Sequence, residues 1–153
     1  MICLLEANKN HLVVPDEKNL VYSILGEAIA NASGVYEFVS KTGFEDGVFS
    51  LRATATDAAG NSSGASDLFS INIDTISPEI ELLGSREIEL EAGQAFIDPG
   101  VVAQDNFDGN LNESITVYGI VDTFEPGEYE LTYNVYDSSR NKSVDELRNI
   151  IIL

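Results

Sequence analysis

Apolar and polar residues alternate along two segments of the chain, one in each half. The apolar positions of these segments are Phe49, Leu51, Ala53 and Ala55 in the first, and Tyr129, Leu131, Tyr133 and Val135 in the second. Successive side chains of a strand point to opposite faces, so each segment is predicted to be a β-strand with one buried face.

The two segments belong to a longer repeat. Residues 44–73 match residues 124–153 without a gap at a constant offset of 80 (124 − 44 = 80), and the identical pairs include Asp57 with Asp137. Similarity at a fixed period is the signature of repeated modules. The chain is therefore expected to contain two related units.

The second unit is predicted to consist of short strands joined by turns. The expected strands are 79–83, 86–92, 101–105, 114–122, 128–136 and 147–153. Many short strands with frequent turns are typical of a β-sandwich. The residues before these strands form a polar joint at 75–78, in which Pro78 favours extended backbone. We therefore expect one domain at 1–74, a linker at 75–78 and a second domain at 79–153.

Residues 16–30 admit two predictions. The apolar residues Leu20, Val21, Ile24, Leu25, Ala28 and Ile29 have helical spacing behind Pro15-Asp16, a typical helix start. Gly26 and the β-branched residues favour a strand instead. Short apolar runs do not decide between the two by period alone, so both helix and strand stay open for this segment.

The composition is strongly acidic. The chain has 26 acidic and 8 basic residues, a formal net charge of −18 at pH 7, which repels nucleic acid and anionic membrane surfaces. Cys3 is the only cysteine, so no intrachain disulfide can form and packing must stabilise two small cores. No apolar run has membrane-spanning length, and the first residues lack the features of a signal peptide. An export signal is therefore expected in a longer precursor.

Motifs in both halves resemble bacterial immunoglobulin-like (Ig-like) domains. Residues 25–38, Asp46-Gly47 and residues 53–61 resemble the repeats of large surface adhesins. Residues 96–100, 105–109 and 126–129 resemble the Ig-like domain of pesticidal crystal proteins and other secreted bacterial proteins. The resemblance implies an all-β fold of two tandem Ig-like β-sandwiches. Because adhesin repeats usually begin with a strand before the segment that matches residues 2–7, the first unit is expected to lack that strand.

The same resemblance implies a function. Domains of this kind act as non-catalytic spacers or stalks in bacterial proteins that are secreted or held at the cell surface. The implied partners are neighbouring Ig-like domains of the same parent protein, together with a host or surface ligand that the sequence does not identify. Fold alone does not fix function, so this role depends on analogy and on the tandem arrangement.

Immunoglobulin topology also implies a specific hydrogen bond. The penultimate strand of such a sandwich often carries a tyrosine two residues before a buried cysteine position. Tyr129 and Leu131 match these two positions. We expect the Tyr129 hydroxyl to donate to nearby backbone, whereas the first unit has Phe49 at this position and cannot make the bond.

Oxygen-bearing side chains are expected to gather at one end of the second unit. In immunoglobulin topology the start of the first strand and two loops lie at that end, which is expected to face the first unit. The residues concerned are Asp74, Asp105, Asn106, Asp108, Asp137 and Asn141. Ca²⁺ takes six to eight hard oxygen ligands, so they predict a calcium site that stiffens the joint between the domains.

Turn formation is the alternative explanation for these residues. Asp and Asn commonly bond their own backbone in turns, and Asp137 with Asn141 could simply close a loop. The segment from Asp105 to Gly109 is not an EF-hand loop, because Phe107 occupies a required ligand position. Both explanations stay open at this stage.

No catalytic constellation stands out. His11 is the only histidine, so a catalytic triad or a multi-histidine metal site lacks residues, and apolar neighbours favour a buried structural role for Cys3. We expect no enzyme activity. The alternative function is a module that binds carbohydrate or protein, or an accessory domain of a secreted hydrolase. A cluster of the aromatics Tyr118, Tyr136, Phe107 and Phe124 on one exposed face would favour the binding module.

Overall fold

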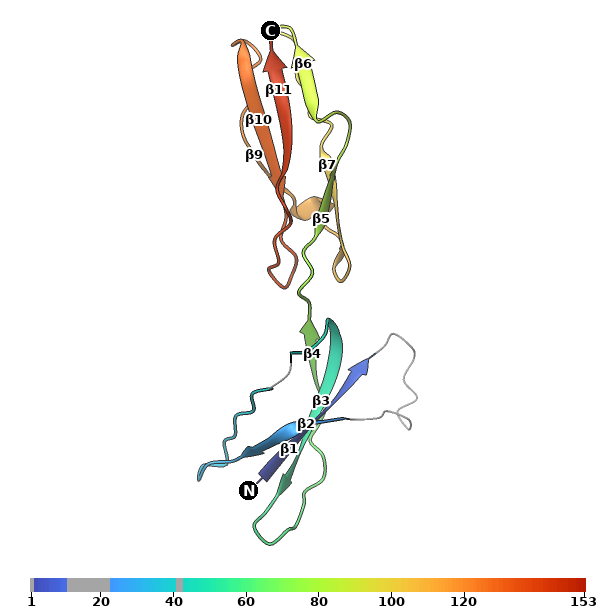
Figure 1. Ribbon diagram of the computed structural model, residues 1–153, viewed down its shortest axis with the longest axis vertical. Coiled ribbons are helices and arrows are strands. Elements are labelled where there is room, and N and C mark those ends of the chain that lie inside the picture. Colours follow the sequence, from blue (N-terminus) through green and yellow to red (C-terminus); the bar gives the residue numbers. More distant parts are fainter. Residues whose placement is uncertain (1, 11–22, 41–42) are drawn as a thin grey trace. The chain divides into compact units, whose positions relative to one another are not determined.

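The computed structural model describes the backbone of residues 2–10, 23–40 and 43–153, and the side chains of residues 24–40 and 43–153. The chain divides into two compact units, Met1–Asp74 and Thr75–Leu153, coloured blue to green and green to red in Figure 1. Apart from one short 3₁₀-helix, the regular elements of the described residues are β-strands. The all-β prediction is therefore confirmed.

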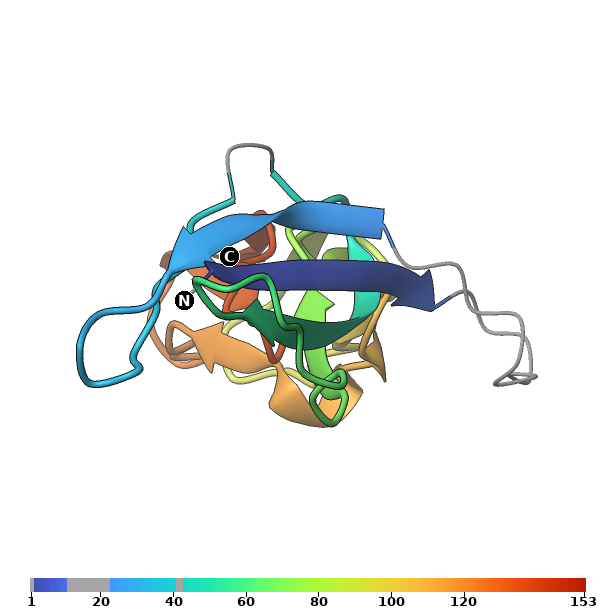
Figure 2. The same ribbon diagram turned by 90° about the horizontal axis from the view of Figure 1, so that it is seen from below.

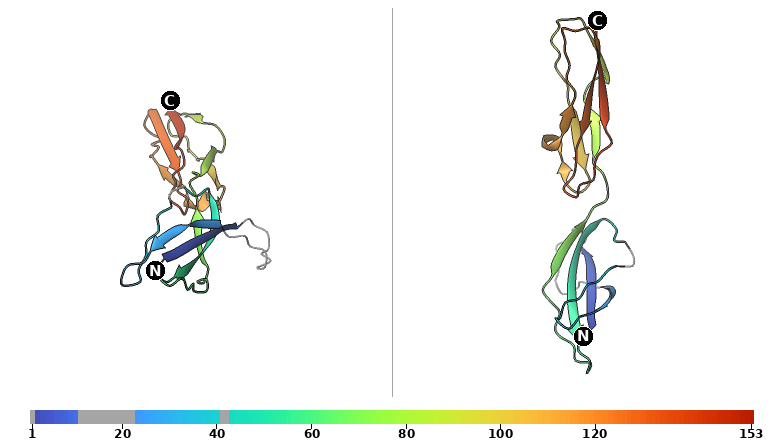
Figure 3. Two further views of the ribbon diagram at one scale, coloured as in Figure 1. Left: turned by 60° about the horizontal axis from the view of Figure 1, so that its bottom comes forward. Right: turned by 90° about the vertical axis from the view of Figure 1, so that its left-hand side faces the viewer.

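The first unit contains a four-stranded antiparallel sheet. Its strands are β1 (Ile2–Asn10), β2 (Ser23–Ile29), β3 (Gly47–Thr56) and β4 (Phe69–Ile73). They have the order β2-β1-β3-β4, with β1 between β2 and β3 in Figure 2 and β3 beside β4 in the right-hand view of Figure 3. Residues 23–29 are thus strand and not helix, whereas residues 16–22 and His11 lie outside the described residues.

The core of the first unit is centred on Phe49 of β3. Phe49 is buried, and Phe44 packs edge-on against it with the ring centroids 4.9 Å apart. Leu51, Ala53 and Ala55 of the same strand are only partly buried. The predicted alternation therefore gives a strand here, but with a less deeply buried face than in the second unit.

The second unit contains two sheets. One has the order β6-β11-β10-β9 and the other the order β5-β7-β8. The strands are β5 (Glu79–Leu82), β6 (Glu87–Leu90), β7 (Val101–Asp105), β8 (Gly109–Asn110), β9 (Thr116–Tyr118), β10 (Gly127–Asn134) and β11 (Glu146–Ile152). β6 pairs with β11 in parallel, and the other pairs are antiparallel.

The two sheets enclose one hydrophobic core. Leu131, Tyr133, Ile150 and Ile152 of β10 and β11 are buried, and Leu82 of β5 and Val101 of β7 pack against them from the other sheet. Burial alternates along β10 as the sequence predicts. This face-to-face packing of two sheets is the β-sandwich expected for the second unit.

The corner hydrogen bond is confirmed. The Tyr129 hydroxyl donates to the carbonyl oxygen of Glu125 at 2.9 Å, and Leu131, at the position of the immunoglobulin cysteine, is buried in the core. The core thus accepts leucine where other members of the topology place half of a disulfide.

The prediction of a strand at 114–122 is wrong in its length. Residues 112–114 form the 3₁₀-helix η1 (Asn112–Ser114), and β9 ends at Tyr118. Gly119 has φ +110°, and a Cβ atom there would collide with the carbonyl oxygen of Glu130. The close approach of the two backbones and the left-handed conformation end the strand.

The same turn closes a hairpin in both units. Asn61 N and Nδ2 donate to the Asp57 carboxylate, both at 2.9 Å, and Asn141 N and Nδ2 donate to the Asp137 carboxylate, both at 2.7 Å. The backbone N–H of each Asp also donates to the carbonyl of its Asn. The offset-80 repeat therefore encodes one turn geometry, used twice.

The two turns differ at one strained position. Gly60 has φ +89° in the first turn, and its equivalent Arg140 has φ +73° in the second. A residue with a Cβ atom is destabilised by about 1–2 kcal/mol in a left-handed conformation. Glycine avoids this cost, but its larger conformational freedom in the unfolded chain offsets about 0.5–1 kcal/mol of the gain. Arg140→Gly should therefore stabilise the second unit by up to about 1 kcal/mol, measured by calorimetry.

The reverse change is the matched control. Gly60→Arg should destabilise the first unit by a similar amount through backbone strain alone, because a Cβ at Gly60 meets no atom within 4 Å. A lower melting temperature for Arg140→Gly would show that the arginine side chain makes a compensating interaction.

Candidate functional site

The loop between β10 and β11 fixes the position of Asp137. Asn141 binds both carboxylate oxygens of Asp137 through its backbone N–H and its side-chain amide, and the same amide lies 3.4 Å from the carbonyl oxygen of Ile76. The carboxylate of Asp137 is buried within the second unit. Asn141 therefore orients Asp137 in addition to closing the turn.

The loop between β7 and β8 fixes Asp105 in a similar way. Its Oδ1 accepts hydrogen bonds from the backbone N–H groups of Phe107 (2.7 Å) and Asp108 (2.8 Å). Asp105 is only 4 % exposed, and its Oδ2 atom is buried without a hydrogen-bond partner. A buried carboxylate oxygen without a hydrogen-bond donor lowers the stability of the fold, because it has lost its contacts with water.

A cross-link joins the two loops. The Asp108 carboxylate accepts hydrogen bonds from the backbone N–H of Ser138 at 2.6 Å and from its hydroxyl at 2.9 Å. Asp108 follows Asp105 in one loop, and Ser138 follows Asp137 in the other. The cross-link therefore holds the two buried aspartates in a defined relation.

Three buried aspartates come together at this point. Carboxylate oxygens of Asp74, Asp105 and Asp137 all lie within 4.8 Å of one another. Asp74 directly precedes Thr75, the first residue of the second unit, and is also buried. Of the six residues that the sequence predicts as ligands, these three form one cluster.

Electrostatics makes this cluster unstable by itself. Two ionised carboxylates 4.8 Å apart repel each other by about 3.5 kcal/mol at an effective dielectric constant of about 20. Repulsion among three carboxylates in a buried site is relieved when an opposite charge lies between them. A bound cation would supply that charge.

The other three predicted ligands are placed differently. Asn106 is exposed, the Asp108 carboxylate is engaged by Ser138, and the Asn141 amide donates to Asp137. Asp108 and Asn141 thus support the loops that carry the cluster. Whether they also bind an ion stays a prediction.

Comparison with known proteins identifies the modules. Residues 6–75 match the family model described as a bacterial Ig-like domain, and residues 80–152 match the model described as a bacterial surface protein, Ig-like domain. The chain consists of two bacterial Ig-like domains in tandem. The second family belongs to surface proteins, which supports an extracellular or surface location, and Ig-like families are generally non-catalytic.

Solved structures give further similarities. A lipoprotein from Bacteroides thetaiotaomicron is 32% identical over 49% of this chain and 37% of its own, with a TM-score of 0.45. A structure of the M60 catalytic domain with two CBM51 domains from Clostridium perfringens is 19% identical over 98% of this chain and 13% of its own, with a TM-score of 0.36. This chain therefore spans less than half the length of either. A search of the curated proteins gave no match.

The second Ig-like domain also contains a buried cation that sequence reasoning missed. Arg148 of β11 is fully buried, and its guanidinium lies 2.5 Å from Asp98 Oδ1. It also donates to the carbonyl oxygens of Leu83 (2.6 Å) and Gly100 (3.0 Å). The guanidinium thus ties β11 to the turn between β5 and β6 and to the loop before β7.

Tyr133 completes this buried cluster. Its hydroxyl donates to Asp98 Oδ1 at 2.9 Å, and the Arg148 guanidinium lies 5.7 Å from the centre of its ring. Burial, followed by the hydrogen bond to Asp98, raises the pKa of Tyr133 to about 12. The tyrosine stays protonated at physiological pH and acts as a donor within the fold, which gives the cluster a structural role.

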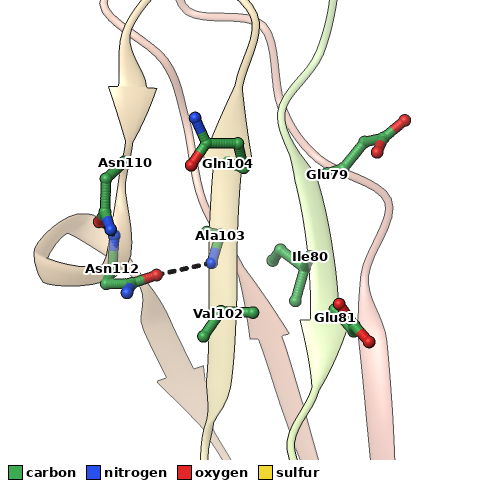
Figure 4. Close-up of a pocket in the computed structure, with 8 residues that line it drawn as sticks. All are labelled: Glu79, Ile80, Glu81, Val102, Ala103, Gln104, Asn110 and Asn112. Carbon is green, nitrogen blue, oxygen red and sulfur yellow. Dashed lines mark hydrogen bonds between the residues drawn. The ribbon is translucent and has the colours of Figure 1, made fainter.

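A pocket lies against β5, β7 and β8 of the second domain (Figure 4). Its volume is about 250 Å³, below the range of about 300–1,000 Å³ that is typical of small-molecule sites. Glu79 and Glu81 line one side and Gln104, Asn110 and Asn112 the other, and all five are exposed. Asn112 Oδ1 accepts a hydrogen bond from Ala103 N at 2.7 Å, so this side chain supports the backbone of β7.

Cys3 and the four aromatic residues named from the sequence remain to be located. Cys3 lies on β1 of the first Ig-like domain, but its side chain is outside the described set. Phe107 is half-buried, and Phe124 is exposed in the loop between β9 and β10, whereas Tyr118 ends β9 and Tyr136 follows β10. In the described part of the chain, no helix is long and apolar enough to cross a membrane.

Proposed function

We propose that the two Ig-like domains form a non-catalytic spacer in a secreted or surface-anchored bacterial protein, and that Asp74, Asp105 and Asp137 bind Ca²⁺. The observation that carries the calcium proposal is the cluster of three buried carboxylates within 4.8 Å. A divalent cation would neutralise the repulsion among them and would give Asp105 Oδ2 a partner.

The ligand chemistry favours calcium among the common metal ions. Only oxygen atoms are offered, without the nitrogen or sulfur ligands that zinc prefers. Mg²⁺ usually keeps several waters and binds one or two carboxylates, whereas Ca²⁺ accepts several carboxylates in flexible geometry. Backbone carbonyls and water would supply the remaining ligands.

The proposed ion supports the spacer role. Asp74 directly precedes Thr75, and Asp105 and Asp137 lie in loops of the second unit. An ion bound by all three would restrict rotation of the chain at Asp74 and Thr75. A spacer benefits from such a restriction because a stiffer joint holds its attached domains further apart.

Small-angle scattering of the whole chain in calcium and in chelator tests this proposal. We expect two separated bodies in both buffers, with a narrower distribution of overall dimensions in calcium. In both buffers, Asp105→Asn should give the scattering curve that the unchanged chain gives in chelator. Identical curves for the unchanged chain would contradict the calcium proposal, and two domains collapsed against each other in both buffers would contradict the spacer.

A further inference from the structure

The outer face of the sheet β6-β11-β10-β9 carries an unusual group of side chains. Tyr133 of β10 and Val135, just beyond its end, are fully buried, so Thr132, Asn134 and Tyr136 lie on the opposite, outer side. The register places Thr132 opposite both Tyr118 of β9 and Leu147 of β11. Cross-strand partners share a face, so Tyr118 and Tyr136 lie on the same outer surface.

Both tyrosines are largely exposed. Tyr118 is 57 % and Tyr136 54 % exposed. Tyr136 lies four residues beyond Thr132, the residue opposite Tyr118, so the two rings start about 13 Å apart along the sheet at about 3.3 Å per residue. A ligand that spans this distance would contact both rings.

Polar side chains occupy the space between the tyrosines. Lys142, which pairs with Tyr136 across an isolated bridge, has its ammonium 2.6 Å from Asp145 Oδ1. Asn134 is only 6 % exposed, and its side chain contributes to lowering the pKa of the Asp145 carboxylate. A buried amide therefore lies beside the ion pair.

The charges of this ion pair are well defined. The hydrogen bond to Asp145 raises the pKa of Lys142 most, burial opposes it, and the Asp145 charge and the nearby Tyr136 and Tyr118 add smaller increases. The hydrogen bond from Lys142 lowers the pKa of Asp145. The surface thus offers a fixed ammonium donor and a fixed carboxylate acceptor beside both tyrosines.

We propose that this tyrosine face (Tyr118, Tyr136, Asn134, Lys142 and Asp145) binds a neutral oligosaccharide. A sugar ring presents an apolar C–H face that packs on an aromatic ring, while its hydroxyl groups need both donors and acceptors at the rim. Tyrosine offers such a surface at low conformational cost, because its side chain has only two rotatable torsions.

The charge of the domain indicates a neutral ligand. Residues 75–153 contain 4 basic and 16 acidic residues, a net charge of −12 (4 − 16), which repels anionic sugars. Within the tyrosine face the Lys142 and Asp145 charges cancel. The proposal goes beyond the spacer function and does not depend on bound calcium.

Titration calorimetry of the whole chain against a panel of neutral oligosaccharides tests the proposal. The panel comprises α- and β-linked oligomers of glucose, galactose, mannose, xylose and N-acetylglucosamine, each taken to about 10 mM. We expect at least one to bind with a millimolar or lower Kd, and Tyr118→Ala and Tyr136→Ala each to weaken it about tenfold or more. The Tyr→Phe variants should keep most of the affinity because they retain the ring.

Phe124→Ala is the matched control, because Phe124 is 78 % exposed and outside the tyrosine face. It should leave the affinity unchanged, and the melting temperatures of all variants should stay close to that of the parent. The proposal is overturned if no neutral sugar binds, if only sialylated or sulfated sugars bind, or if binding is unaffected by both tyrosine changes.

Discussion

Asp98→Ala should lower the free energy of unfolding of the second Ig-like domain by about 3–5 kcal/mol. The variant leaves the fully buried Arg148 guanidinium without the carboxylate that lies 2.5 Å from it, and it removes the acceptor of the Tyr133 hydroxyl. Uncompensated burial of a charge is among the largest single-residue effects on stability. Calorimetry of the whole chain should show the loss in the transition of the second domain.

Glu146→Ala provides the control for this prediction. Glu146 also pairs with an arginine, Arg86 at 2.6 Å, but Arg86 is 63 % exposed. Exposed ion pairs contribute about 0–1 kcal/mol, so this variant should change stability little. Replacing both Asp98 and Arg148 by apolar residues of similar volume should restore much of the loss. A cost below about 1 kcal/mol for Asp98→Ala would mean that water reaches the guanidinium in solution.

Asp105→Asn should change stability in opposite directions in calcium and in chelator. The asparagine Oδ1 can still accept the backbone bonds of Phe107 and Asp108, so the turn is preserved while one of three clustered charges is removed. In chelator the variant should melt above the parent, because repulsion is relieved. In calcium at about a hundredfold excess over Kd, it should lose most of the roughly 2.7 kcal/mol that a bound ion provides.

Melting of both proteins in both buffers measures this effect. Asp122→Asn is the matched control, since Asp122 Oδ1 also accepts a backbone hydrogen bond, from Phe124 at 2.9 Å, but its side chain is exposed and outside the cluster. It should leave both melting temperatures unchanged. If the parent melts at the same temperature with calcium and with chelator, the calcium proposal is wrong.

Features that depend on short segments were predictable from sequence. The strand β10 follows from its alternation, and the Tyr129 bond joins residues only four apart. The approach of Asp105 to Asp137 was predictable because immunoglobulin topology places their loops at one end. In each case a local pattern or a known topology determines the geometry.

Features that depend on the register of distant segments were not predictable. Asp98 and Arg148 are fifty residues apart, and nothing in their local sequence marks them as partners. Tyr118 and Tyr136 were noted as aromatics, but their common face follows only from the pairing of β9 with β10. The early end of β9 depends on the approach of Gly119 to the carbonyl of Glu130, a tertiary contact.

The repeated turn has a consequence for how the two domains reach their folds. The hairpins that it closes, β3–β4 and β10–β11, pair strands that follow each other in the sequence, whereas the parallel pair of β6 with β11 joins segments about sixty residues apart. Local pairs lose less loop-closure entropy and form sooner. Neighbouring domains with similar sequences are prone to exchange strands during folding. Two features oppose that exchange. The hairpin closes early within its own domain, and the N-terminal strands differ between the domains.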